Sequence, residues 1–367
     1  MDSRVNDILP VKKQRESNME LLRIVAMLLV MVVHANFRAL PVPTAHEIIA
    51  EPTSKFLMFF TEAVSVIAVN VFVLMSGWFG IRPKAKRLGE LLFQVLFFGL
   101  FGIVVCWFFA PDRLLTTPQY GSAISRLFMC GETDYWFVKT YIALYLISPV
   151  LNAFIEKASQ RQFATVLIAF FVFQCAYDWL SNATKWMASG YSLTSFAWLY
   201  MLARYMRLYP VKLWQKGKWF DACVYACYVA ILTIAMFFIK KNGLRGGILY
   251  FYSCPLVILG AIHFMLFFTK LPPFSNKIVN WVAISSFAIY LTHSSNFIGG
   301  FYDKGILGWF MTMSRGEFIG CTSLLITAVF VGSILVDKVR IALWQGLILC
   351  CDKIKNKNKQ LKVFKRD

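Results

Sequence analysis

Long apolar runs dominate this sequence of 367 residues, and ten of them are long enough, or nearly long enough, to cross a membrane as helices. In chain order they cover residues 19–37, 57–79, 88–110, 136–151, 163–180, 194–209, 219–239, 247–269, 278–300 and 318–345. The composition agrees, because 58% of the residues are hydrophobic and only 16% are charged. We therefore predict an all-α fold, a polytopic transmembrane helical bundle of about ten spans.

The distribution of basic residues sets the expected orientation. The formal net charge is +19, but the lysines and arginines form short clusters between apolar runs and in the C-terminal tail, which is the pattern of cytoplasmic loops. Alternating the loops across ten spans places most of the 38 Lys and Arg residues on the side that both termini share. We expect cytoplasmic tails at 1–17 and 346–367, a membrane domain at 18–345, and no nucleic acid among the partners.

The run at 194–209 has two interpretations, because Arg204 and Arg207 shorten its apolar part. It is either a span or an interfacial helix.

The run at 19–37 follows a polar segment and is long enough to remain as a membrane anchor, so a cleavable signal peptide is not expected.

The nine cysteines give no sign of a metal centre, since none has the spacing of metal ligands. Five of them lie within apolar runs, where a thiol behaves as a small hydrophobic group. We expect neither a structural disulfide nor a metal site.

Arg23 and His34 form the first candidate site. Eleven helical steps of roughly 100° return to within about 20°, so the two side chains share one face of the first helix, about 16 Å apart. Glu20 lies on the same face. Charged groups in a membrane helix are expected to face protein or water, which favours a functional role. Alternatively, Arg23 is a flanking cytoplasmic charge and His34 an interfacial residue.

The second run carries further polar groups along one face. Glu62 is expected at the depth of His34, where it could orient the imidazole; it could equally be the wetted start of a helix. Ser76 and Gly77 are expected near Arg23. A basic cluster with Lys84, Lys86 and Arg87 follows and suits an anionic ligand, although a short topogenic loop would look the same. The candidate residues for binding this ligand are Arg23, Ser76, Gly77, Lys84, Lys86 and Arg87.

Later runs add candidates for lining a substrate path. Lys139 lies within an apolar run, where a lysine pairs, faces a cavity or snorkels outward. Ser286, Tyr290 and His293 recur at i, i+4 and i+7, a polar stripe typical either of an active-site lining or of helix–helix hydrogen bonding.

Four segments together resemble the acyltransferase 3 family of integral-membrane acyltransferases. They are Glu20-Leu21-Leu22-Arg23 with His34, Phe72-Val73-Leu74-Met75-Ser76-Gly77-Trp78-Phe79, Trp136-Phe137 through Tyr145-Leu146-Ile147-Ser148-Pro149, and Ser286 through Ile289-Tyr290-Leu291-Thr292-His293. Their order and spacing span nearly the whole chain. Two features depart from the family pattern: Glu20 stands where Asp is common, and Lys84-Ala85-Lys86-Arg87 replaces two arginines three residues apart.

The resemblance implies a multi-pass protein of the bacterial plasma membrane that uses cytoplasmic acyl-CoA, usually acetyl-CoA, to O-acylate a sugar of an extracytoplasmic glycan. It also implies that Arg23 and His34 are the essential pair. Because a sugar hydroxyl is a poor nucleophile, we expect His34 to act as its base, directly or through an acyl-histidine. Arg23, Lys84, Lys86 and Arg87 would then hold the anionic part of CoA. A transporter or flippase of a glycan or lipid-linked sugar is the alternative from another class.

Overall fold

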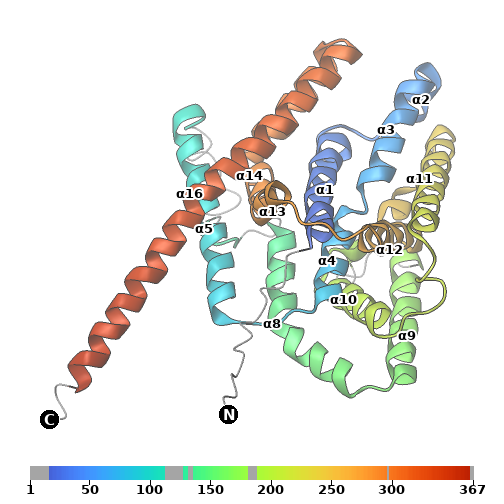
Figure 1. Ribbon diagram of the computed structural model, residues 1–367. Coiled ribbons are helices and arrows are strands. Elements are labelled where there is room, and N and C mark those ends of the chain that lie inside the picture. Colours follow the sequence, from blue (N-terminus) through green and yellow to red (C-terminus); the bar gives the residue numbers. More distant parts are fainter. Residues whose placement is uncertain (1–15, 112–126, 131–134, 181–187, 296, 364–367) are drawn as a thin grey trace.

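The computed structural model describes residues 16–111, 127–130, 135–180, 188–295 and 297–363. These residues form helices and connecting segments, with no strand among them, and Figure 1 shows their arrangement. In chain order the helices are α1 (Ser17–Val33), η1 (His34–Arg38), α2 (Ala45–Ala50), α3 (Pro52–Ser65), α4 (Ala68–Phe79), α5 (Ala85–Phe109), α8 (Trp136–Lys157), α9 (Gln160–Leu180), η2 (Ala188–Gly190), α10 (Leu193–Leu208), α11 (Lys218–Lys241), η3 (Gly247–Tyr250), α12 (Pro255–Thr269), α13 (Lys277–Ile284), α14 (Ser286–His293), α15 (Gly299–Thr312) and α16 (Arg315–Val363). The all-α class is confirmed.

Seven helical segments of the described chain are long and apolar enough to cross a membrane. They are Ser17–Arg38, Pro52–Phe79, Ala85–Phe109, Trp136–Lys157, Lys218–Lys241, Gly247–Thr269 and Arg315–Lys353. The predicted runs at 163–180, 194–209 and 278–300 are not among them. The multi-pass character is therefore shown, whereas ten spans and two cytoplasmic termini remain predictions.

The run predicted as one helix at 278–300 is broken in the structure. α13 ends at Ile284, α14 ends at His293, and α15 begins only at Gly299. Hydropathy averaged over a whole span did not show this break, although the polar residues Ser294 and Ser295 follow His293 in the sequence. The break turns the chain at His293, next to the first helix.

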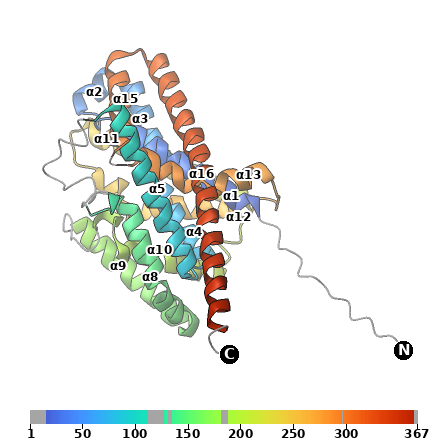
Figure 2. The same cartoon turned by 90° about the vertical axis from the view of Figure 1, so that its left-hand side faces the viewer.

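Helix α1 lies at the centre of the bundle and contacts α3, α4, α12, α13 and α14 (Figures 1 and 2). Leu22, Ala26 and Met31 are fully buried on it. At His34 the helix widens into the π turn η1, where Asn36 leaves helical geometry with φ −97° and ψ −111°. Such turns in an α-helix frequently mark functional sites.

Gly77 brings helices α4 and α10 into close contact. A Cβ atom added at Gly77 would lie 2.3 Å from the carbonyl oxygen of Tyr200 and 2.9 Å from the Cβ of Ala203. Both of these α10 residues are fully buried. The glycine therefore serves helix packing.

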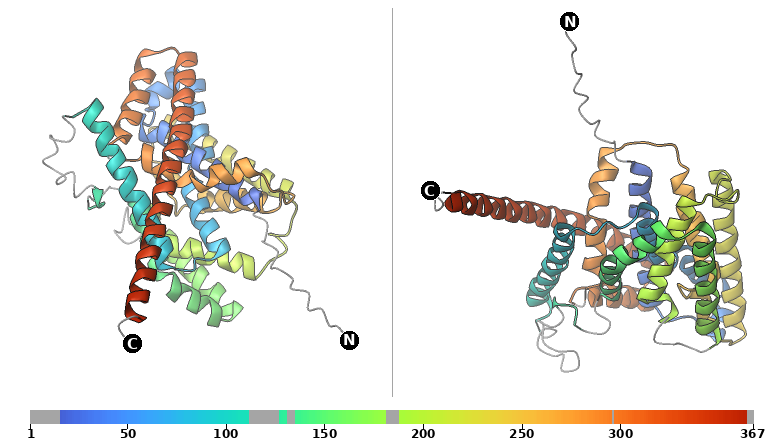
Figure 3. Two further views of the ribbon diagram at one scale, coloured as in Figure 1. Left: turned by 60° about the vertical axis from the view of Figure 1, so that its left-hand side comes forward. Right: turned by 90° about the horizontal axis from the view of Figure 1, so that it is seen from below.

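Helix α16 runs obliquely past α5 and α14 (Figure 1), and its C-terminal part projects beyond the other helices (Figure 3). A buried polar group joins α16 to α5: Gln94 donates to Asp337 over 3.0 Å, and Arg340 pairs with the same carboxylate at 2.8 Å. Mutual pairing of these groups limits the free energy cost of burying them.

Candidate active site

His34 lies in the π turn and faces the histidine that ends α14. Its Nδ1 is 2.9 Å from Nε2 of His293, although 259 positions separate the two residues in the sequence. Nδ1 of His293 is 2.6 Å from the carbonyl oxygen of Ile289. The structure thus joins two predicted residues, His34 from the catalytic set and His293 from the substrate-lining set, in one pair.

A hydrogen bond between the two rings requires one particular tautomer of a neutral His34. A carbonyl oxygen only accepts, so Nδ1 of His293 must carry a hydrogen, and its Nε2 is then an acceptor when the ring is neutral. Nδ1 of His34 therefore donates to it, and Nε2 of His34 keeps a free lone pair. This is the form of histidine that can take a proton from a substrate.

Arg38 lies beside the same imidazole. Its Nη1 is 2.8 Å from Nδ1 of His34, and its Nη2 is 2.7 Å from Asp303 and 3.2 Å from the carbonyl oxygen of His293. A guanidinium can only donate, so its contact with His34 fits the opposite tautomer, with the hydrogen on Nε2. The tautomer of His34 therefore decides whether it is bonded to His293 or to Arg38.

Arg38 and Asp303 were not predicted as site residues. The position of Arg38 directly after the run at 19–37 is typical of a charge that flanks a span. Asp303 lies on α15, far from His34 in the sequence. The signal that could have identified Arg38 is its spacing of four residues from His34, which places both on one side of a helical turn.

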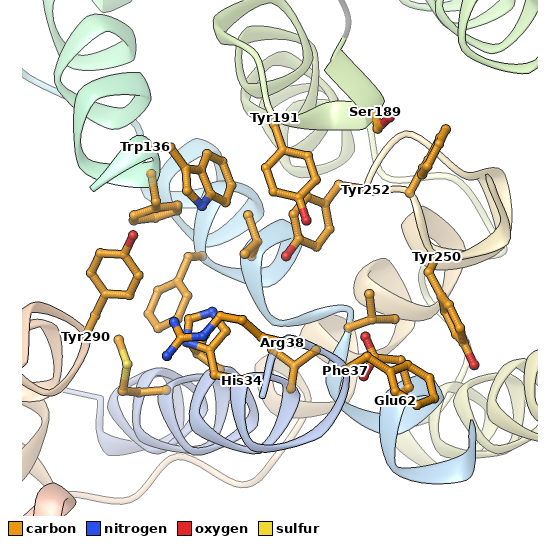
Figure 4. Close-up of a pocket in the computed structure, with 18 of the residues that line it drawn as sticks. His34, Phe37, Arg38, Glu62, Trp136, Ser189, Tyr191, Tyr250, Tyr252 and Tyr290 are labelled. Atoms are coloured by element: carbon orange, nitrogen blue, oxygen red, sulfur yellow. The ribbon is translucent and has the colours of Figure 1, made fainter. Parts of the chain in front are cut away.

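The first of two cavities has a volume of about 600 Å³ and is shown in Figure 4; we call it the outer cavity after the orientation expected from the basic residues. His34, Arg38 and Glu62 lie on one side of it. The other walls are mostly aromatic and include Phe37, Trp136, Tyr191, Tyr250, Tyr252 and Tyr290. This volume falls within the range of small-molecule sites.

Glu62 lines the outer cavity but does not hold the imidazole. Its Oε2 accepts a hydrogen bond of 3.0 Å from Nδ2 of Asn36, and the backbone N–H of Phe37 also donates to the carboxylate. The described partners of His34 are instead His293, Arg38 and Ser294. The predicted orienting contact is therefore wrong, because the π turn directs Asn36 toward Glu62.

Tyr191 contributes a hydroxyl from the segment before α10. Burial raises the pKa of Tyr191. A hydrogen bond with Tyr252 lowers this pKa, but the effect of burial is larger. The hydroxyl is therefore protonated at neutral pH and can donate to a ligand.

The second cavity, here called the inner cavity, has a volume of about 460 Å³ and contains three arginines, Arg23, Arg82 and Arg87. Arg23 is 2.6 Å from Glu20, and its side chain is 34% exposed. Ser76 and Ser286 line this cavity as well. A cavity with several guanidinium groups is suited to phosphate groups, which bind arginine through paired hydrogen bonds.

The two cavities share three lining residues, Phe72, Phe137 and Phe287. They come from α4, α8 and α14, and the rings of Phe72 and Phe137 lie 6.3 Å apart. We call these three residues the phenylalanine constriction. The constriction lies between the inner cavity and the outer cavity.

Five predicted site residues are not part of the lining of either cavity, and one of them is His293, described above. Gly77 packs against α10, and Lys84 and Lys86 are exposed beside the inner cavity, where Arg82 takes the place expected for them. Lys139 is partly buried on α8. By contrast, Tyr290 lines the outer cavity as predicted.

No group of three or more His, Cys, Asp or Glu residues with the geometry of a metal site occurs in the part of the chain that the structure describes. The nine cysteines are free thiols.

The fold and site define a helical membrane protein with a histidine pair at one cavity and three arginines at a second cavity, which shares the phenylalanine constriction with the first. The acyltransferase domain family matches residues 16–336, most of the chain, and the protein belongs to this family. Neither a curated protein nor a solved structure matches the chain.

Proposed function

We propose that the protein transfers an acetyl group from cytoplasmic acetyl-CoA to a hydroxyl of a cell-surface or exported polysaccharide sugar. The observation that carries the proposal is the position of His34, in one cavity that is joined through the phenylalanine constriction to a second cavity with three arginines. Family membership supplies the reaction class, acyl transfer.

The inner cavity suits the donor. The phosphates of CoA are strongly anionic, and Arg23, Arg82 and Arg87 offer them planar, paired donors. The uncharged pantetheine arm then passes between the rings of the constriction. Helical geometry places Arg23 and His34 about 16 Å apart, so the reacting thioester is well separated from the phosphates.

The outer cavity suits a sugar. Its aromatic rings offer flat apolar faces with polar edges, and Glu62 and the hydroxyl of Tyr191 offer an acceptor and a donor for sugar hydroxyls. Such a combination of apolar walls and a few polar groups is typical of small-molecule sites.

The reaction uses the free lone pair on Nε2 of His34. Nε2 takes the proton of the sugar hydroxyl as its oxygen attacks the thioester carbonyl. The C–O bond forms and the C–S bond breaks, and the imidazolium returns the proton to the departing thiolate, giving CoA and the ester. Arg38 lies where it can stabilise the negative carbonyl oxygen of the tetrahedral state.

The alternative, a transporter or flippase of a glycan, is favoured by one feature, the serial arrangement of the two cavities. Transport would need no acyl-CoA. The two functions therefore differ in whether they require acyl-CoA, which an assay can measure directly.

The test is a transfer assay in proteoliposomes with radiolabelled acetyl-CoA and chemically deacetylated polysaccharide from the native host. We expect label in the polysaccharide with the wild type and none with His34→Ala. Polysaccharide crossing the membrane without acetyl-CoA, and without gaining label, would establish the transporter instead.

A further inference from the structure

A third cavity lies on the other side of the π turn, between α3 and the hairpin of α15 and α16. It has a volume of about 590 Å³ and is separate from the two cavities assigned to donor and acceptor. Helices α2, α3 and α15 gather at this end of the bundle (Figure 2). Its walls are largely apolar and include Val32, Leu40, Leu57, Met58, Phe310, Phe318, Ile319 and Ile326.

Lys55 places a buried positive charge in this cavity. Its side chain is only 8% exposed, and it forms one long ion pair, with Oε1 of Glu47 at 4.0 Å, which is beyond hydrogen-bond distance. The other oxygen of Glu47 is already bonded to Thr44. Phe310 offers only a ring face, 5.3 Å from the ammonium. A buried ammonium without a close partner is costly, so the site favours an additional anion.

The remaining charges at the cavity do not supply that anion. Glu51 is paired with Arg315 at 3.0 Å, and both side chains are at least half exposed. This pair is neutral as a unit. In addition, Thr322 Oγ1 is buried at the cavity and has no hydrogen-bond partner in the described structure. Among the described residues, the cavity therefore holds a cation with one long ion pair and a hydroxyl without a hydrogen-bond partner.

We propose that this cavity binds the phosphate headgroup of an anionic membrane lipid, with Lys55 as its cation and an acyl chain along the apolar wall. A lipid is favoured over free phosphate because α3 and α16 belong to segments that can span a membrane, and both contribute apolar residues to the wall. Thr322 can donate to the same headgroup.

Asn36 places the lipid next to the proposed active site. It lines the third cavity, while its Nδ2 donates to Glu62 of the outer cavity and to the carbonyl oxygen of Met58. A bound lipid would therefore lie against the π turn that carries His34. The lipid site itself does not depend on the proposed acyl transfer.

The experiment measures lipids retained by the purified protein, using native mass spectrometry after exchange into mixed phosphatidylglycerol and phosphatidylcholine nanodiscs. We expect the wild type to retain phosphatidylglycerol preferentially. Lys55→Gln should reduce this preference about tenfold, as expected for the loss of a charged hydrogen bond. Lys304→Gln is the matched control, because Lys304 is an exposed cation on α15 outside the cavity.

Equal retention by Lys55→Gln and the wild type would overturn the proposal, and so would equal losses in Lys55→Gln and Lys304→Gln. Displacement of the lipid by millimolar inorganic phosphate would identify a free-phosphate site instead. If Lys55→Gln does not fold, Thr322→Phe tests the same cavity from α16 by filling it. Phosphatidylglycerol retained at wild-type level in a folded Thr322→Phe variant would also contradict the proposal.

Discussion

His34 is useful as a base only if its Nδ1 carries the hydrogen, and His293 is the residue that favours this state. The chain of hydrogen bonds from His34 through His293 to the carbonyl oxygen of Ile289 favours a hydrogen on Nδ1 of His34. Arg38 favours the opposite tautomer. His293 therefore acts as a positioning residue, and its role can be separated from that of a structural side chain.

Replacing His293 tests the tautomer directly. His293→Gln keeps an acceptor for Nδ1 of His34, whereas His293→Leu removes it. We expect His293→Leu to lower kcat by about 100-fold or more with little change in the KM for acetyl-CoA, and His293→Gln to recover much of the loss. Steady-state transfer kinetics provide the measurement. Equal kcat values in the two variants would show that hydrogen bonding at His293 is unimportant.

Single residues could be predicted from the sequence only in part. Helical spacing predicted Arg23 and His34 on one face of a helix, and the structure places the first at the inner and the second at the outer cavity. Helical spacing could not pair His34 with His293, since that contact joins distant segments. Gly77 illustrates the other limit: the sequence indicates a close approach at glycine, but does not say whether a ligand or a helix approaches.

At the scale of elements, the breaks in the helices position the site. The π turn after α1 directs Asn36 to Glu62, and the break after α14 brings His293 to His34. Hydropathy predicted where the chain is apolar, but it could not locate these breaks. They depend on contacts between helices, such as the bond from Tyr302 to the carbonyl oxygen of Met31.

Gly77 tests the packing of α4 on α10. Gly77→Ala forces a Cβ against a backbone oxygen, and overpacking of this kind costs about 1–3 kcal/mol. We expect the melting temperature in detergent to fall by about 2–10 °C. Gly89→Ala is the control, because its Cβ would meet Trp344 at an ordinary 3.5 Å. Equal melting temperatures of Gly77→Ala and the wild type would contradict the close approach.

The phenylalanine constriction joins α4, α8 and α14 and should limit the size of the acyl group. Phe72→Ala and Phe287→Ala widen it, so we expect a several-fold rise in transfer from butyryl-CoA relative to acetyl-CoA. Phe97→Ala, a truncation on α5 outside both cavities, should leave the ratio unchanged. Competition between the two labelled donors gives the ratio, and an unchanged ratio in both constriction variants would refute this role.

At the scale of the whole molecule, the sequence correctly predicted an all-helical, multi-pass membrane protein of the acyltransferase family. The number of spans is harder to predict, because a short helix such as α10 can be buried within the bundle. Phe196 and Tyr200 of α10, for example, are fully buried. Apolar composition alone cannot distinguish such helices from spans.

Orientation can be tested by cysteine accessibility in a background without the native cysteines. From the distribution of basic residues, we expect cysteines at Lys84 and Lys353 to react only from the cytoplasmic side, and those at Thr44 and Lys304 only from outside. A membrane-impermeant maleimide applied to intact cells makes the distinction. Labelling of position 353 from outside would rule out a cytoplasmic C-terminal tail.

The central claim is that the donor is held at the arginines of the inner cavity while the chemistry occurs at His34. Calorimetric titration of CoA into the detergent-solubilised protein tests it most directly. We expect His34→Ala, which is inactive in transfer, to bind CoA as the wild type does. Arg87→Gln should bind about tenfold or more weakly, and its neighbour Lys86→Gln should bind normally. Loss of CoA binding in His34→Ala, with normal binding in Arg87→Gln, would contradict the account.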